Sequence, residues 1–153
     1  MNTTTITTNT ATTGNAQNTA AAETLFGLAM PMAQAFGMQG EVFADDKAVI
    51  RMPFLPAYAN SRGDMHGGVF ATLLDCVLAS ACRTHAPERF GVLTVDLTVH
   101  YVASAHTEVV ASAECLRRGR SLCFAQGHVH DAQGRLLAMA TGTFKLVERQ
   151  SEA

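Results

Sequence analysis

Asp75 is the residue of this sequence that most directly suggests chemistry. It lies in the middle of a long apolar stretch, Gly67–Arg83, between Leu74 and Cys76. A carboxylate among apolar side chains is costly to desolvate unless it has a partner. A carboxylate in a dry site is also a stronger proton acceptor, as a general base must be. We therefore predict that Asp75 is catalytic. The plainer interpretation is a buried aspartate that is satisfied by a neighbouring strand or subunit.

The loop before this stretch could stabilise negative charge. It runs from Asn60 to His66 and ends on Gly67 and Gly68, at the expected start of a helix. The first N–H groups of a helix have no partner within it, and the helix dipole favours negative charge there. Such a site could hold the oxyanion formed when an ester or thioester is attacked. A glycine pair can also serve only a tight turn or close packing.

Other polar residues are weaker candidates. His128 and His130 alternate on an expected strand, but no acidic residue or cysteine stands at ligand spacing, so no metal site is predicted. Asp96 is a rival carboxylate, placed by alternation on the same strand face as Thr94. Its regular strand position favours a structural or subunit-interface role.

Composition and termini restrict the partners. The chain has 11 basic and 13 acidic residues, so no polybasic field predicts nucleic acid or an anionic membrane as partner. No stretch approaches the roughly 20 apolar residues that cross a bilayer. The first residues are mostly Thr, Asn and Ala, and they lack the basic start and apolar run of a secretory signal. We expect a soluble, cytoplasmic protein.

The length of 153 residues suits one domain. Residues 1–19 are expected to be a disordered tail, residues 20–148 a single domain and residues 149–153 a C-terminal tail. The cysteines show no CxxC and no zinc-ligand spacing, and we expect buried free thiols. They are Cys76, Cys82, Cys115 and Cys123.

The order of expected elements indicates the fold class. A short helix should start at Pro31, and residues 41–53 alternate like a strand that turns at Asp45-Asp46. After a loop, Gly67–Arg83 reads as a helix that is apolar almost all round, so protein should wrap it. Four strands then follow, over residues 91–103, 107–116, 121–129 and 136–147. This order predicts an α+β domain in which a curled antiparallel sheet wraps a long central helix, the hotdog fold.

The pattern of Asn60, His66, Gly67, Gly68 and Asp75 resembles the signature of the phenylacetate-pathway (PaaI-type) hotdog thioesterases. The resemblance runs from about residue 36 to residue 147. Within it, residues 94–101, 119–121 and 134–144 resemble the long strand, the glycine turn and the last hairpin of the family.

This resemblance implies hydrolysis of an acyl-coenzyme A thioester to the free acid and CoA, without a metal or an organic cofactor. The Gly67 N–H would polarise the thioester carbonyl, and Asn60 would orient the carbonyl or the attacking water. Asp75 would be general base or nucleophile. Thr94 would hold the water, and His66 would shape the loop.

The arginine-rich turn has two interpretations. Its charges, Arg117, Arg118 and Arg120, are most simply solvated. By the resemblance, this turn with Gly119 and Ser121 would contact CoA, whose phosphates suit arginine forks.

One subunit should supply only part of each site. Gly67 and Asp75 lie eight residues apart on one helix, which is about 12 Å at 1.5 Å per residue. Reacting groups must lie within a few ångström of the same carbon. A two-fold dimer with antiparallel central helices would solve this, and the resemblance implies a homodimer, often paired into a tetramer.

Two other functions within the fold stay open. A hotdog enoyl-CoA hydratase would resemble a different signature, usually an Asp-His pair near the helix start. A non-catalytic module that binds acyl-CoA is the other. Such modules carry a DNA-binding segment, whereas the start of this chain has neither basic charge nor a helix-turn-helix pattern. The sequence leaves the acyl group open between aromatic and aliphatic.

Overall fold

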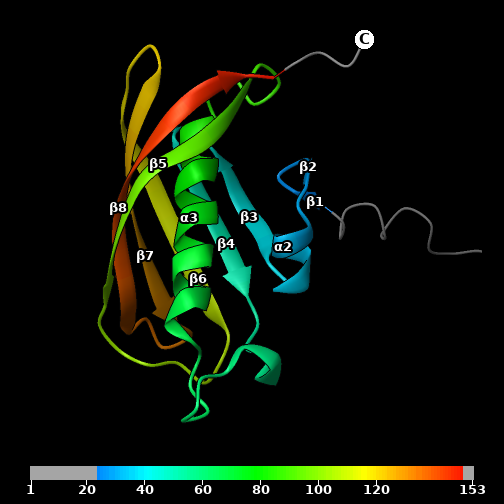
Figure 1. Cartoon of the computed structure of the whole chain (residues 1–153), viewed down its shortest axis with the longest axis vertical. Helices are drawn as coiled ribbons and strands as arrows, with labels where there is room; N and C mark the ends of the chain where they lie inside the picture. Colours follow the sequence, from blue (N-terminus) through cyan, green and yellow to red (C-terminus); the bar gives the residue numbers. More distant parts are fainter. Residues whose placement is uncertain (1–23, 150–153) are drawn as a thin grey trace, which may run out of the picture.

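The computed structural model describes residues 24–149, in which a six-stranded antiparallel sheet curls round one long helix (Figure 1). The elements are β1 (Thr24–Leu25), β2 (Leu28–Ala29), α2 (Pro31–Ala35), β3 (Gln39–Ala44), β4 (Lys47–Met52), the 3-10 turn η1 (Pro56–Tyr58), α3 (Gly67–Arg83), β5 (Phe90–Tyr101), β6 (Val109–Arg118), β7 (Leu122–Asp131) and β8 (Leu136–Glu148). The predicted α+β hotdog arrangement is confirmed. The expected tail over residues 1–19 lies outside the described residues.

Helix α3 has the bounds that the sequence predicted. Its inward side is buried against β4, β6 and β7, with Leu73, Leu78 and other apolar residues fully covered. It is not wrapped on all sides, however. Thr72, Asp75 and Ala79 follow one another at helical spacing and stay half-buried. The sheet wraps α3 as predicted, and Asp75 therefore lies on the strip that the sheet leaves partly exposed.

The sheet order is β3-β4-β6-β7-β8-β5, so β5 is an edge strand of the described sheet. Its pairing with β8 shifts between Thr94 and Asp96: Thr94 pairs with the fully buried Phe144, and Asp96 with Thr143. Paired residues share a face, and successive residues of a strand face opposite sides. Thr94 therefore faces the helix and Asp96 faces away. The expectation that they share a face is wrong, because a bulge at Val95 adds one residue.

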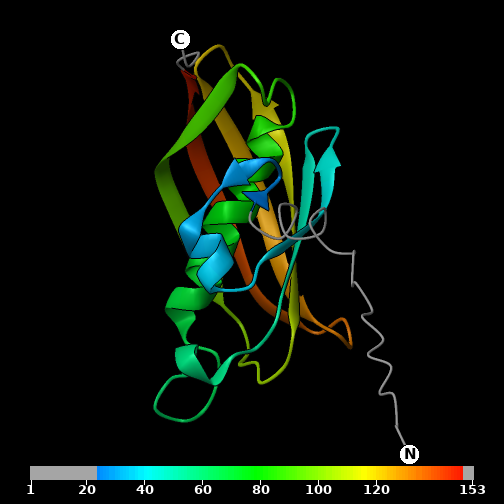
Figure 2. The same cartoon turned by 90° about the vertical axis from the view of Figure 1, so that its right-hand side faces the viewer.

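The segment before β3 lies over the side of α3 that the sheet leaves uncovered (Figure 2). The helix expected from Pro31 is present as α2, and β1 and β2 form a small hairpin before it. Phe26 of that hairpin stacks on Phe43 at a centroid distance of 4.8 Å, and its carbonyl accepts a hydrogen bond from Arg83 at 2.7 Å. None of the helices over residues 24–149 has the length and apolar character needed to cross a membrane.

Gly127 of β7 lies close to Leu78 of α3, and adding a methyl group there should be destabilising. A Cβ at Gly127 would lie 2.6 Å from Leu78 Cδ1 and 2.9 Å from the Ser112 carbonyl oxygen. Gly127→Ala is expected to lower the free energy of unfolding by about 1–3 kcal/mol through overpacking. Gly91→Ala is the control, since its Cβ would meet Val147 at an ordinary 3.5 Å. Urea unfolding followed by circular dichroism measures both, and equal stabilities would contradict the expectation.

Candidate active site

Asp75 and Thr94 come together from α3 and β5. Thr94 Oγ1 donates a hydrogen bond to Asp75 Oδ1 at 2.7 Å. Both residues line a pocket of about 370 Å³. Its opposite wall comes from the segment before β3 and consists of Leu25, Leu28, Met30 and Met32. The carboxylate is thus fixed through one oxygen and faces a pocket with an apolar wall.

Cys76 lines the same pocket but is poorly suited to be a nucleophile. Burial raises the pKa of its thiol to about 11, and the charge of Asp75 adds to this effect. Because the thiolate is the nucleophilic form of cysteine, Cys76 is almost entirely inactive at neutral pH. Carboxylate chemistry at Asp75 is the alternative that this pocket provides.

Gly67 lies in a second pocket of about 330 Å³, together with Asn60 and Tyr101. The Gly68 N–H donates to His66 Nδ1 at 2.9 Å, and the Val69 N–H donates to the His66 carbonyl at 2.9 Å. Within residues 24–149 the Gly67 N–H has no hydrogen-bond acceptor. His66 therefore caps the helix, as a loop-shaping residue would, and only the first glycine N–H is free to bind an oxyanion.

Asn60 organises the loop that leads to Gly67. Its Oδ1 accepts the N–H groups of Arg62 at 2.8 Å and Asp64 at 3.1 Å, so its amide nitrogen is the end left for a substrate. Asp64 is only 8% exposed and pairs with Arg62 at 3.2 Å and His106 at 3.0 Å. Sequence reasoning missed this buried aspartate, because one acidic residue in a polar loop carries no distinguishing pattern.

The predicted site residues therefore form two groups in different pockets of one chain. Asp75 and Thr94 share one pocket, and Asn60 and Gly67 share the other. Eight residues of α3 separate Gly67 from Asp75, which is about 12 Å along the axis. The single chain does not bring the candidate oxyanion donor and the carboxylate to one carbon.

The arginines at the turn between β6 and β7 differ in exposure to solvent. Residues 119–121 and Arg117 are exposed. Arg118 instead points inward: its guanidinium donates to the Cys82 carbonyl and pairs with Asp46, and its side chain is 17% exposed. The expectation of a solvated turn charge is wrong for Arg118, because the guanidinium links the turn to α3 and to the β3–β4 turn.

Within residues 24–149, His128 and His130 on β7 have no third potential metal ligand close to them. The rings of His128 and His130 lie 6.2 Å apart. Across residues 24–149, the one group of three closely placed potential metal ligands consists of Cys82, Cys115 and Cys123. All four cysteines are free and buried, as predicted.

Comparison with known proteins agrees with this fold and with the predicted class of enzyme. The family model of the Thioesterase superfamily matches residues 62–138. Acyl-coenzyme A thioesterase 13 of Mus musculus is 30% identical over 103 residues, which are 65% of this chain and 73% of the relative. The medium/long-chain acyl-CoA thioesterase YigI of Escherichia coli is 25% identical over 131 residues, 75% of this chain and 84% of the relative.

A solved structure extends the comparison to three dimensions. The PaaI protein of the E. coli phenylacetic acid degradation operon superposes with a TM-score of 0.72, at 18% identity, over 77% of this chain and 85% of that one. This likeness shows a shared fold. The matches together confirm the predicted class of enzyme, a thioesterase. The chain belongs to the thioesterase superfamily.

Proposed function

We propose that this protein hydrolyses acyl-CoA thioesters at sites shared between the two subunits of a homodimer. The observation that carries the proposal is the division of the site residues between two pockets of one chain. In a two-fold dimer with antiparallel α3 helices, Gly67 of one subunit meets Asp75 of the other, and the symmetry creates two equal sites.

The roles follow from the hydrogen bonds of each group. The free Gly67 N–H binds the thioester oxygen, which becomes an oxyanion when water attacks the carbonyl carbon. Thr94 occupies Asp75 Oδ1, so Oδ2 is left to take the proton of that water. Collapse of the tetrahedral intermediate breaks the C–S bond, the proton held by Asp75 passes to the leaving sulfur, and the free acid and CoA are released. Asn60, through its amide nitrogen, orients the carbonyl or the water.

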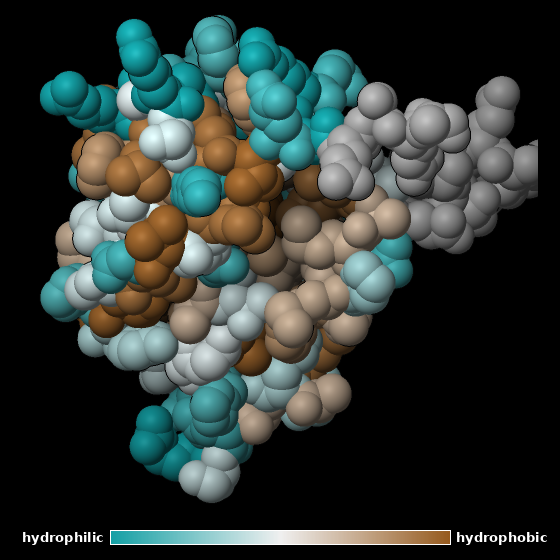
Figure 3. All heavy atoms as spheres, turned by 45° about the horizontal axis from the view of Figure 1, so that its top comes forward, coloured by the Kyte–Doolittle hydropathy of each residue, from teal (hydrophilic) through white to brown (hydrophobic). Residues whose placement is uncertain are grey.

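The exposed surface of β5 supports the dimer. Leu93 is 58% exposed and Val95 is 61% exposed on this edge strand. Exposed apolar residues on an unprotected edge favour pairing with a second sheet. Figure 3 shows hydrophobic residues gathered at the surface of the molecule, with a hollow among them. Pairing at β5 would also cover the open face of α3 near Asp75.

The wall of the Asp75 pocket supports a hydrophobic acyl group. Two leucines and two methionines line it, and flexible methionines fit apolar groups of varied shape. The names of the mouse and E. coli relatives specify acyl-CoA, and that of YigI specifies medium and long chains. We therefore propose an aliphatic acyl-CoA as the substrate class.

A panel of acyl-CoAs with aliphatic chains of increasing length and with aromatic acyl groups tests the function. Release of free thiol, read with a chromogenic thiol reagent, should rise with the length of aliphatic chains. Hydration of an enoyl-CoA, followed by loss of its ultraviolet absorbance, would identify a hydratase instead. Tight binding of acyl-CoA without turnover would identify a binding module. Either result would contradict the proposal.

Arg117 and Arg120 are expected to contribute to CoA affinity and not to the chemical step. The Arg117→Ala, Arg120→Ala double variant should raise KM and keep kcat, the sign of binding that is equal in ground and transition states. The effect should shrink with added salt, because exposed charges are screened. Arg118 is left unchanged, since its guanidinium holds Asp46 and Cys82. An unchanged KM at low salt would return both arginines to the role of solvated surface charges.

A further inference from the structure

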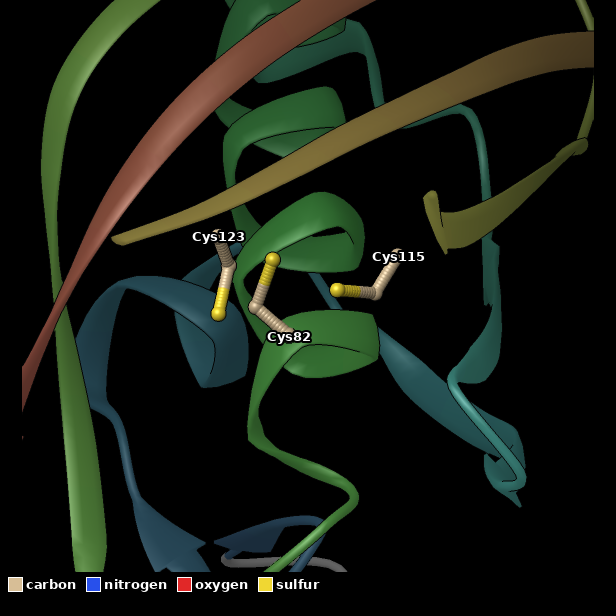
Figure 4. Close-up of side chains that lie close together, drawn as sticks. All are labelled: Cys82, Cys115 and Cys123. Carbon is tan, nitrogen blue, oxygen red and sulfur yellow. The ribbon is translucent and has the colours of Figure 1, made fainter. Parts of the chain in front are cut away.

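Three cysteines far apart in the sequence meet in the core. Cys82 comes from α3, Cys115 from β6 and Cys123 from β7, and their sulfur atoms gather in one place (Figure 4). Cys82 and Cys123 are fully buried, and Cys115 is 6% exposed. The proposed hydrolysis uses none of them. We call this group the three-thiol cluster.

The three-thiol cluster has the dimensions of a site for one metal ion. All three Sγ atoms lie within 4.8 Å of one another. For such a triangle, one point lies within about 2.8 Å of every corner, whereas a zinc–thiolate bond is about 2.3 Å long. Side-chain shifts of a few tenths of an ångström would therefore place all three sulfurs on one ion.

A cation beside the cluster offsets the charge of thiolate ligands. Arg118 Nη1 donates to Cys123 Sγ at 3.5 Å, and the same guanidinium binds the Cys82 carbonyl. Arg118 is partly buried, and its contact with sulfur places positive charge beside the proposed ligands.

We propose that the three-thiol cluster binds one cuprous ion, Cu(I). Thiolate ligands select soft metals, and among these Cu(I) accepts a three-sulfur environment. Structural zinc almost always takes four protein ligands, and residues 24–149 place only three in this cluster. Binding forms Cu–S bonds and releases one proton for each thiol that becomes a thiolate. No electron is transferred.

Anaerobic titration of the fully reduced protein with Cu(I), in competition with a chromophoric Cu(I) chelator, tests the proposal. We expect one Cu(I) bound per chain. X-ray absorption should then show three sulfur neighbours and no nitrogen or oxygen neighbour. The absorption measurement needs no variant, so it stays decisive even if a core substitution impairs folding.

Single alanine variants identify the ligands. Cys82→Ala, Cys115→Ala and Cys123→Ala should each weaken Cu(I) binding by more than about 100-fold, the upper range for loss of a residue that only supports a ligand. Cys76→Ala is the matched control: this thiol is also buried on α3, but it contacts Met30 Sδ at 3.9 Å and lies outside the cluster. It should bind like the wild type, and circular dichroism should show every variant folded.

Three results would overturn the proposal. The first is no Cu(I) bound by reduced wild-type protein, which would leave the cysteines as packing residues. The second is wild-type affinity in a folded variant of any cluster cysteine. The third is Zn(II) bound at one per chain with Cu(I) excluded, which would refute the choice of ion. Hydrolysis is read separately by thiol release from acyl-CoA, so failure here leaves the proposed function untouched.

Discussion

Asp75→Asn is expected to lower kcat by a factor on the order of 10² or more, the scale of a lost general base. Asparagine keeps the size of the side chain and an oxygen that can accept the Thr94 hydrogen bond, now 2.7 Å long. It cannot take a proton from water. The loss should appear at saturating acyl-CoA in the thiol-release assay, with an unchanged circular dichroism spectrum.

Asp96→Asn is the matched control for this substitution. Asp96 is two residues from Thr94 on β5, yet the bulge at Val95 turns it away from the helix and from Asp75. The same change of charge should therefore leave most of kcat. Wild-type turnover in Asp75→Asn together with an inactive Asp96→Asn would move the base to the outer face of β5 and refute the assignment.

The parts of the fold that depend on local sequence were predictable. Gly67–Arg83 forms the expected helix because its apolar pattern, the glycines at its start and the capping His66 all act within a few residues. Asp45 and Asp46 form the expected turn, with φ of 52° and 62°, a backbone region that aspartate tolerates better than most residues. The hydrogen bond from Thr94 to Asp75 was not predicted: the resemblance implied only that Thr94 holds the water, and the contact depends on how β5 packs against α3.

The parts that were not predictable depend on strand pairing. The bulge at Val95 reverses the face of Asp96, and no residue type in that regular alternation marks it. Arg118 turns inward because Asp46, 72 residues away in the sequence, lies beside it in the β3–β4 turn. In the same way the register of β6 with β7 brings Cys115 and Cys123 to one face above α3. Such convergence follows from tertiary structure alone.

Two inactive variants should restore activity to each other if the site is shared between subunits. The first variant, Asp75→Asn, lacks the proposed general base. The second, Gly67→Pro, lacks the N–H proposed to bind the oxyanion. Within residues 24–149 that N–H has no acceptor, so its loss breaks no hydrogen bond, and the first position of a helix tolerates proline. Asn60→Ala would be less clean, because its Oδ1 holds two loop N–H groups.

Gly67→Ala separates crowding from loss of the donor. Any Cβ at this position lies 3.3 Å from the Tyr101 ring, so alanine and proline share that contact, while alanine keeps the N–H. We expect Gly67→Pro to lose about 10²–10³ in kcat, as for loss of one oxyanion donor, and Gly67→Ala to keep most of it. Equal losses would show that space beside Tyr101 matters and the N–H does not.

Mixing then tests the geometry. Gly67→Pro and Asp75→Asn are unfolded, combined in equal amounts and refolded together. In a mixed dimer one site carries both substitutions and the other carries neither, because a two-fold interface exchanges the same groups in both directions. Random pairing makes about half of the dimers mixed, so activity should recover to about a quarter of the wild type. Sites built within single chains would give only the average of two inactive enzymes. Absence of recovery in a sample whose mixed dimers are verified by native mass spectrometry would rule out the shared site.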